Sequence, residues 1–466
     1  MPRQRHSTAT THHPATQARG ISAVLGAFVF AVALAAAACG PGTAPAAATI
    51  PLRFTYWGSP VEKEAVEQMV RAFETAHPDI DVEAVHIPNS EYIARVSAMM
   101  AEGRPPDVGY LFETHAPQWA ADGKVLDLTD IVRNDPELSS RLPETYYYFA
   151  PGRTIGTNTS AEIMLLFYNK EVFDRAGVPH PPAQAELAWT WEQFVDAARR
   201  LTTDRGGRHP GDPGFDVDGI DVFGVSFERD LWYGYYPFIY SNGGQIVNDD
   251  GTRLMLDSPE AIDAVQRLTD LMWTHHVMPT PGQAQRLPSS DVLLQTGKLA
   301  MDIRGQWKLL DYASMQGLNL GVAVLPKLKE PKTLILGSPT VIFSGARNLD
   351  AAVAFYKFHN DPASVDLFRR GLWMPLQKAY YTDAALIDSW IDNPAHPPES
   401  RGAVVDYTLC CAAPTPHYAV KNFGQIAEEV IQPAIDRVWT RDLSAAQALR
   451  AAVRAAAPLL SGRWDK

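Results

Sequence analysis

Hydrophobic and polar residues between positions 52 and 112 alternate between the period of a strand and the period of a helix. Apolar residues stand at every second position in 52–56 and in 80–82, which predicts two strands. Residues 66–73 and 93–100 carry apolar side chains at helical spacing, and 107–112 is a third, mostly apolar strand. This β-α-β-α-β order predicts a parallel sheet with right-handed crossovers, whose ligands lie beyond the carboxyl ends of the strands.

A second α/β unit is predicted to begin at 163–168, where a continuous apolar run is typical of a strand covered on both faces. A helix over 191–201 follows Thr190, the first residue of a capping box. A further helical stripe covers 262–272 and is opened by a Ser-Pro pair. The chain therefore contains two successive regions of mixed α/β structure.

Three shorter signals complete the pattern. Residues 248–251, with the sequence Asn-Asp-Asp-Gly, predict a hairpin turn, and Ser444 caps a terminal Ala-rich helix. The stretch 204–221 is rich in Gly, Asp and Pro and is interpreted as a surface insertion. The sequence has no tandem repeat of fixed period, which argues against solenoids and propellers.

The first forty residues have the pattern of a secretory signal. Three arginines and no acidic residue precede or flank an apolar run, 21–38, that ends in small residues. Bacterial lipoproteins are cut and acylated at a cysteine placed as Cys39 is, and the small residues of 39–50 suit a flexible tether. We predict removal of 1–38 and lipid attachment at Cys39. A soluble secreted protein remains the alternative, because Ala36 stands where such signals usually carry leucine.

Composition narrows the classes of partner. Hydrophobic residues make up 46% and charged residues 20% of the 466 positions, as in globular proteins, and the length suits two lobes. The net charge of −12 argues against nucleic acid and anionic membrane surfaces, which reward clusters of Lys and Arg. After the leader, no second apolar run reaches the roughly 18 residues of a spanning helix. These values favour an exported protein that acts on an uncharged or weakly charged molecule.

Two of the three cysteines are adjacent, Cys410 and Cys411. Export favours oxidation, so they form either a vicinal disulfide, which would present a flat apolar plate inside a pocket, or two buried thiols. The sequence leaves both alternatives open, because connectivity is not readable from spacing.

Seven short segments, taken in order, resemble those of family 1 extracellular solute-binding proteins, the sugar receptors of bacterial ABC importers. The family includes maltose-binding and glycerophosphodiester-binding receptors. The segments are 54–58 (FTYWG), 73–80 (FETAHPDI), 106–108 (PDV), 168–170 (YNK), 241–244 (SNGG), 297–301 (GKLAM) with 305–307 (GQW), and 324–326 (VLP). Together they span nearly all of the chain after the leader.

The resemblance implies the α/β fold of type II periplasmic-binding proteins, in which two lobes joined by three hinge crossings enclose a ligand cleft. By analogy the crossings fall near 155–160, 337–343 and 372–377. The expected N-terminal lobe comprises 51–157 and 342–372, and the expected C-terminal lobe comprises 158–341 and 373–466.

A sugar cleft needs flat rings against C–H faces and planar polar groups for hydroxyls. The substrate-binding candidates are Trp57, Tyr92, Glu113, Asn158, Ser160, Trp232, Tyr233, Arg304, Gly305, Trp307, Gly337, Ser338, Trp373 and Tyr418. Trp57 and Glu113 end predicted strands, and Trp307 follows a turn at a strand end. The resemblance to the maltose and glycerophosphodiester receptors supports most of the others. For Trp57, Trp232, Tyr233 and Trp307 the alternative is a core residue. For Tyr92 it is an ordinary residue at a helix start, and for Glu113 it is an acid at a helix N-terminus.

Other chemistry finds little support in the sequence. The acids at 212, 216, 218 and 221 resemble a calcium loop, but Val225 occupies the position of the closing Glu. The adjacent His275 and His276 face different directions on a helix and suit solvent better than one metal. The sequence has no nucleophile elbow, Walker loop or Cys-His zinc spacing. We therefore expect no metal and no cofactor.

The resemblance implies a monomeric receptor, not an enzyme, at the outer face of the cytoplasmic membrane. It would capture a carbohydrate by lobe closure and deliver it to the transmembrane subunits of an ABC permease. A glycerophosphodiester receptor, in which Arg304 binds the phosphate, is the first alternative. The second is an exported carbohydrate-active enzyme that uses Glu91 and Glu113 as paired carboxyls.

Overall fold

The computed structural model describes residues 49–466. The predicted signal sequence 1–38, the acylation site Cys39 and nearly all of the tether lie outside the described residues. Among residues 49–466, no helix combines the length and the hydrophobicity that crossing a membrane would require.

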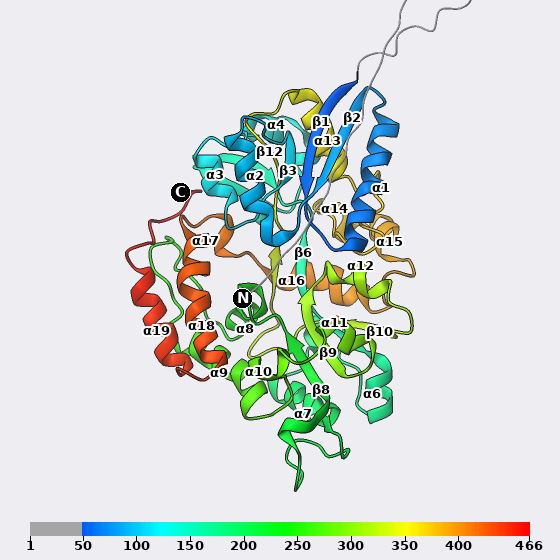
Figure 1. The fold of residues 1–466 in the computed structure, drawn as a ribbon, viewed down its shortest axis with the longest axis vertical. Helices are drawn as coiled ribbons and strands as arrows, with labels where there is room; N and C mark the ends of the chain where they lie inside the picture. Colours follow the sequence, from blue (N-terminus) through cyan, green and yellow to red (C-terminus); the bar gives the residue numbers. More distant parts are fainter. Residues whose placement is uncertain (1–48) are drawn as a thin grey trace, which may run out of the picture. The chain divides into compact units, whose positions relative to one another are not determined.

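The first sheet has the parallel arrangement that the sequence predicts (Figure 1). Its strands are β1 (Ile50–Tyr56), β2 (Ile80–His86), β3 (Val108–Tyr110) and β12 (Thr340–Ile342), in the order β12-β3-β1-β2. Strand β1 runs parallel to β2 and β3, whereas β12 pairs antiparallel with β3. The connecting helices α1 (Pro60–Ala76) and α2 (Tyr92–Ala101) confirm the predicted crossovers, although β3 is shorter than the apolar run 107–112.

The second sheet is built around β6 (Glu162–Asn169), which is buried along nearly its whole length, as predicted. The other strands are β7 (Thr203–Asp204), β8 (Ile220–Phe227), β9 (Leu299–Gly305), β10 (Leu320–Ala323), β11 (Thr333–Leu336) and β13 (Ala412–Ala413). Their order is β13-β11-β6-β9-β8-β7, and β10 also pairs with β6. All pairings of β6 are antiparallel, so this sheet is mixed.

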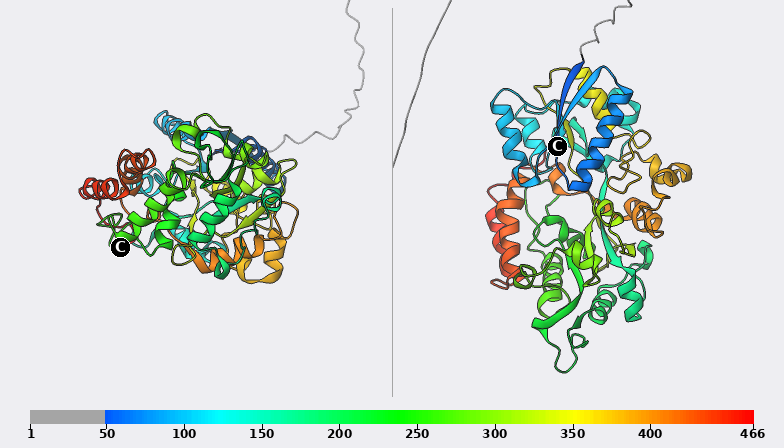
Figure 2. Two further views of the ribbon diagram at one scale, coloured as in Figure 1. Left: turned by 90° about the horizontal axis from the view of Figure 1, so that it is seen from below. Right: turned by 45° about the vertical axis from the view of Figure 1, so that its right-hand side comes forward.

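Helices pack against both sheets. With the first sheet lie α3 (Ala116–Ala121), α4 (Thr129–Asn134), α5 (Pro136–Ser139), α13 (Leu349–His359) and the hairpin of β4 (Tyr146–Ala150) and β5 (Arg153–Thr157). The remaining helices are α6 (Lys170–Ala176), α7 (Trp191–Leu201), α8 (Tyr236–Ser241), α9 (Pro259–Trp273), α10 (Pro281–Ala284), α11 (Ser290–Gln295), α12 (Lys308–Ala313), α14 (Ala379–Thr382), α15 (Ala384–Ile391), α16 (Tyr407–Cys411), α17 (Phe423–Ile426), α18 (Gln432–Trp439) and α19 (Ala445–Ala456). Figure 2 shows α18 and α19, drawn in red, side by side.

Local signals in the sequence also match the structure. Capping boxes begin α1, α7 and α19, and Ser258 caps α9. In the predicted turn, the Gly251 amide donates to the Asn248 carbonyl at 2.9 Å. These caps satisfy backbone groups that would otherwise lack partners at the helix ends.

Three stretches of chain connect the two sheets, and we call the parts built on them the N-terminal and C-terminal lobes. The chain passes from β5 to β6 and from β11 back to β12, and the bridge between Ala161 and Met374 places a third stretch beside the first. Asn158 and Pro339 form a second bridge, so the stretches lie side by side. At Gly337, whose φ is +141°, a Cβ atom would lie 2.6 Å from the Ser160 carbonyl oxygen. The exact lobe boundaries given above stay a prediction.

Candidate functional site

A cleft of about 700 Å³ lies between the two lobes. The N-terminal lobe contributes the ends of β1 and β3 and the start of α1. The C-terminal lobe contributes a single helical turn at Trp232–Gly234 and the start of α12. It also contributes Glu428, which lies in the helical turn that precedes α18. The connecting residues Gly337 and Ser338 also line it. The carboxyl ends of β1 and β3 thus lie where the parallel sheet predicts a ligand edge.

Aromatic rings form part of both walls. On the N-terminal lobe, Trp57 stacks on Phe112 with ring centroids 4.4 Å apart and an interplanar angle of 17°. On the C-terminal lobe, Tyr233 meets Trp307 edge to face at 5.5 Å. A Cβ atom on Gly305 would collide with the Trp307 ring, so this glycine makes room for the ring. The arrangement presents ring surface to one cleft from two sides.

Carboxyl groups line the space between these rings. The Ser338 hydroxyl donates to Glu113 at 2.8 Å, and the Ser160 hydroxyl donates to Glu162 at 3.1 Å. The backbone amide of Ser59, in the capping box of α1, donates to Glu62 at 3.1 Å. The same capping box that starts α1 therefore aims a carboxyl group into the cleft.

Burial changes the protonation of these groups. It raises the pKa of Glu62 to about 7 and that of Glu162 to about 8, because the charged forms lose hydration. Neighbouring acids add to both shifts: Asp311 acts on Glu62, and Glu62 and Glu113 act on Glu162. Burial also raises the pKa of Glu113, against the opposing effect of the Ser338 hydroxyl. The carboxyl groups are thus close enough to influence one another.

Positive charge in the cleft is already paired. Lys308 is the only Lys or Arg in the lining, counted over residues 49–466, and its ammonium lies 2.8 Å from both Asp291 and Asp311. Arg304, two residues before the start of the Gln306-Trp307 turn, does not line the cleft. Its guanidinium pairs with Glu228 and Asp302 and donates to Ser290 at 2.6 Å.

Two of the contacts between the lobes lie beside the cleft. The Ser59 hydroxyl of the N-terminal lobe donates to Asp311 of the C-terminal lobe at 2.9 Å. At the second contact, a Cβ atom on Gly424 of α17 would lie 2.2 Å from the carbonyl oxygen of Thr114. Backbone from the two lobes therefore approaches closely, and glycine is the residue that permits the approach.

Eight of the predicted residues lie together in the cleft lining. They are Trp57, Glu113, Trp232, Tyr233, Trp307, Gly337, Ser338 and Trp373. They come from both lobes and from two of the connecting stretches, so residues distant in sequence meet in one space. Trp373 is 2% exposed and packs on His359, so nearly all of its ring lies beneath the surface of the cleft.

Tyr92, Asn158 and Ser160 do not line the cleft, and their predicted positions are corrected here. Tyr92 is 0% exposed and donates from its hydroxyl to the Tyr110 carbonyl at 2.8 Å. Asn158 donates to the Leu336 carbonyl at 3.2 Å, and Ser160 is buried beneath Glu162. All three satisfy buried polar groups below the surface of the cleft.

Arg304, Gly305 and Tyr418 also lie outside the lining. The ion pairs of Arg304 hold it away from the cleft, and Gly305 lies under the Trp307 ring. Tyr418 is buried and donates from its hydroxyl to the Ile335 carbonyl at 3.3 Å. These residues support the cleft from behind.

Sequence reasoning missed several residues of the lining. They include Glu62, Phe112, Glu162, Lys308, Asp311 and Glu428. Glu62 carried a signal, since it is the fourth residue of a Ser-x-x-Glu capping box, but that pattern points to helix stability. Glu162 is the polar first residue of a strand that is otherwise mainly apolar. A polar residue at that end of the strand was the signal in the sequence that could have pointed to the cleft.

The adjacent cysteines are joined as a vicinal disulfide. Cys410 is exposed and Cys411 is 7% exposed, at the end of α16. Neither lines the cleft, so the interpretation of the pair as a plate inside the binding pocket is wrong for this cleft.

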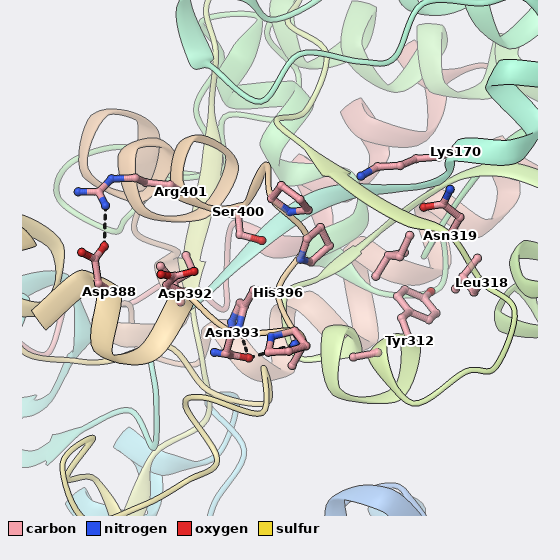
Figure 3. A pocket seen from close by; sticks show the side chains of 17 residues that line it. Lys170, Tyr312, Leu318, Asn319, Asp388, Asp392, Asn393, His396, Ser400 and Arg401 are labelled. Carbon is pink, nitrogen blue, oxygen red and sulfur yellow. Dashed lines mark hydrogen bonds and ion pairs between the residues drawn. The ribbon is translucent and has the colours of Figure 1, made fainter. Parts of the chain in front are cut away.

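A second cavity of about 780 Å³ lies between α15, the Pro-rich loop after it, and the segment 312–320 (Figure 3). His396 and Ser400 line it, and the Asp388 and Arg401 side chains at its edge pair at 2.8 Å. None of the predicted substrate-binding residues belongs to it.

Comparison with known proteins assigns the chain to a family. Residues 57–365 match the family model described as bacterial extracellular solute-binding protein. A provisionally named binding protein of Brucella abortus is 25% identical over 335 residues, covering 70% of this chain and 75% of that protein. The sn-glycerol-3-phosphate-binding periplasmic protein of Brucella melitensis is 21% identical, covering 71% of this chain and 76% of that protein.

Among solved structures, the chain is similar in fold to an ABC substrate-binding protein from Listeria monocytogenes in complex with cycloalternan. The TM-score is 0.73 at 23% identity, over 87% of this chain and 98% of that chain. The two-lobed architecture, the cleft between the lobes and a family match over more than half of the sequence lead to one assignment. The chain belongs to the bacterial extracellular solute-binding proteins of ABC importers.

Proposed function

We propose that this protein captures a carbohydrate outside the cell and delivers it to an ABC permease. The observation that supports the proposal is the cleft itself, where rings from both lobes flank a row of carboxyl groups. Rings bind the C–H faces of a sugar, and carboxyl oxygens accept its hydroxyls. The cycloalternan complex of the Listeria protein and the sugar-receptor resemblance of the sequence agree with this ligand class.

Lobe closure is the proposed mechanism of capture. A sugar that contacts Trp57 on one lobe and Trp307 on the other binds the closed state better than the open state and shifts the equilibrium toward it. At a micromolar Kd the net binding free energy is about −8 kcal/mol, after the cost of closure has been subtracted. Either lobe alone should then bind poorly. The closed form presents the permease with a surface that the open form lacks, and the sugar leaves unchanged.

We propose the substrate-binding set Trp57, Glu113, Trp232, Tyr233, Trp307, Gly337, Ser338 and Trp373, now with Glu62 and Glu162 added. A thermal-shift screen of the mature protein against oligosaccharides tests the function. A ligand at a hundred times its Kd adds about 2.7 kcal/mol of stability, so a true ligand raises the melting temperature by several degrees. Failure of every glycan to shift it would count against a carbohydrate receptor.

The glycerophosphodiester alternative comes from the family resemblance of the sequence, and the charges in the cleft oppose it. A phosphate needs unpaired donors of positive charge, and Lys308 is already paired with two aspartates. Arg304, the predicted phosphate ligand, is held outside the lining by Glu228 and Asp302. Competition between glycerophosphocholine and a disaccharide panel in the same screen separates the two ligands.

The enzyme alternative loses its predicted pair of carboxyls. Glu91 is exposed in the turn before α2 and does not line the cleft with Glu113. Incubation of the purified protein with its best ligand, followed by chromatography, should return the ligand intact. A cleaved product would overturn the receptor function.

Attachment to the membrane is a separate part of the proposal. Cleavage before Cys39 and acylation of its thiol would hold the mature chain to the outer face of the membrane. Cells fed a radioactive fatty acid should label the wild-type protein and leave the Cys39→Ala variant unlabelled and released into the medium. Label on the variant would overturn the attachment site.

A further inference from the structure

The carboxyl groups of the cleft outnumber its positive charges, and this imbalance bears on the ligand. Five carboxyl-bearing residues line it: Glu62, Glu113, Glu162, Asp311 and Glu428. Lys308 is the only Lys or Arg of the lining within residues 49–466, and one of its two partners, Asp291, lies outside that lining. Within residues 49–466, the lining therefore carries more carboxyl groups than Lys and Arg side chains.

We propose that the natural ligand is a sugar bearing a protonated amino group, which the cleft binds more tightly than the corresponding neutral sugar. The inference rests on the proposed function and specifies the substrate class of that same site. It concerns the charge of the ligand, whereas the proposed function concerns only its polyol character.

The hydrogen bonds of the acids leave them able to accept more. Glu113 takes one hydroxyl hydrogen bond, from Ser338, and Glu162 takes one, from Ser160. Each bond occupies one carboxyl oxygen, and a carboxylate offers about four acceptor sites. An ammonium group donates three hydrogens and carries the opposite charge, so it can satisfy two neighbouring carboxylates at once. A sugar hydroxyl donates one hydrogen and brings no positive charge that would favour the ionised form of these carboxyl groups.

Buried polar groups point to the same chemistry. Burial is the main cause of the raised pKa of each acid, and neighbouring carboxyl groups add to it: Glu62 and Glu113 raise the pKa of Glu162, and Glu428 raises that of Glu113. The Tyr110 hydroxyl in the same lining is buried with no hydrogen-bond partner among the described residues, and Tyr110 is 3% exposed. A cationic ligand would relieve the repulsion between the carboxylates, and the tyrosine oxygen can accept a hydrogen bond from it.

The rings of the cleft suit a cation as well as a sugar face. Trp57 with Phe112 and Tyr233 with Trp307 present aromatic surface on either side of the acids. A cation near the face of such a ring is attracted by the negative charge density of the ring, and Trp is the best partner. The combination of flanking rings and unpaired acids distinguishes this cleft from one that is merely polar.

Matched ligands that differ only in charge test the inference. Calorimetric titration of the mature protein would compare the chitosan trisaccharide, which carries amines, with cellotriose and the N-acetylated trisaccharide of the same linkage. Trehalosamine and trehalose form a second pair, and any neutral ligand found in the thermal screen is compared with its amino-deoxy form. We expect at least about tenfold tighter binding of the amine in each pair that binds, and a larger loss of its affinity in high salt.

Variants of the acids complete the test. Glu113→Gln and Glu162→Gln keep the shape of the side chain and remove its charge, and each should weaken binding of the amino sugar several-fold more than binding of its neutral counterpart. Glu64→Gln on the exposed face of α1 is the control and should have no effect. Neutral sugars that bind as tightly as their amino forms would overturn the inference and leave the proposed function intact. If neither series binds, the proposed function itself fails.

Discussion

The cleft and the second cavity have similar volumes, about 700 and 780 Å³, but differ in what surrounds them. The cleft is bounded by both lobes, by rings and by unpaired acids. The second cavity lies beside α15 and the proline-rich loop 394–398, and its Lys170 and Arg401 pair with Glu399 and Asp388. Volume therefore does not identify the binding site here. Our proposal that the cleft is the binding site rests on its position between the two lobes and on its lining of rings and carboxyl groups.

Among the changes that test this comparison, removal of the ring at position 307 should have the largest effect on sugar binding. We expect Trp307→Ala to weaken sugar binding by roughly a hundredfold or more, because it deletes one of the two ring walls. Trp307 is only partly buried, so the melting temperature of the empty protein should change little. Asn319→Ala, in the second cavity, is the matched control and should leave the affinity unchanged. Loss of affinity in the control, or a large fall in the stability of Trp307→Ala, would reverse the assignment.

A methyl group at position 424 should have the next largest effect, because it separates the lobes without touching the ligand. The Cβ of Gly424→Ala would lie 2.2 Å from the Thr114 carbonyl oxygen, so the two backbone segments must move apart to accept it. We expect roughly tenfold weaker binding, with a larger radius of gyration by X-ray scattering when ligand is present. Gly282→Ala in α10 has no atom within 4 Å of its new Cβ and is the control. Unchanged affinity in Gly424→Ala would mean that closure does not need this contact.

The sequence predicted the parts of the site that backbone direction determines. Trp57 and Glu113 lie in the cleft because they end parallel strands, and strand ends were visible as changes from apolar alternation to polar residues. Trp307 lies there because Gly305 gives its ring room. For these residues the local pattern and the final position agree.

The rest depended on which way a side chain points after packing. Tyr92 begins the helix α2 as expected but turns into the core, where its hydroxyl reaches the Tyr110 carbonyl. Arg304 lies in β9, and it pairs with Glu228, which directly follows the adjacent strand β8, outside the lining of the cleft. Glu62 was missed because the sequence pattern around it indicates only its capping role at the start of α1. Nothing in that pattern indicates that its side chain lines the cleft. The spacing of apolar residues in the sequence does not reveal in which direction such a side chain points after packing.

The smallest predicted effect is a difference in pH dependence between the cleft and the second cavity, measured through the contribution of one titratable residue in each to the stability of the protein. Burial raises the pKa of Glu162 in the cleft to about 8, so the folded state binds more protons than the unfolded state between roughly pH 4.5 and 8. Its contribution to stability is therefore lost as the pH rises through this range. Burial lowers the pKa of His396 in the second cavity to about 4, so its contribution is complete above about pH 6.5 and is lost as the pH falls toward 4.

Denaturant titrations of the empty protein at several pH values separate the two groups. Between pH 6.5 and 8, wild-type stability should fall relative to Glu162→Gln, by a fraction of the about 1.4 kcal/mol per pH unit that one full proton would give. Between pH 4 and 6.5, stability should fall less steeply toward acid in the His396→Gln variant than in the wild type, and the remaining fall includes the contribution of the buried His359 and His417, whose pKa values burial also lowers. The two variants thus change opposite ends of the pH range. A difference between wild type and Glu162→Gln that stays constant from pH 6.5 to 8 would mean that Glu162 titrates as an ordinary exposed acid, and the electrostatic contrast between the cleft and the second cavity would be lost.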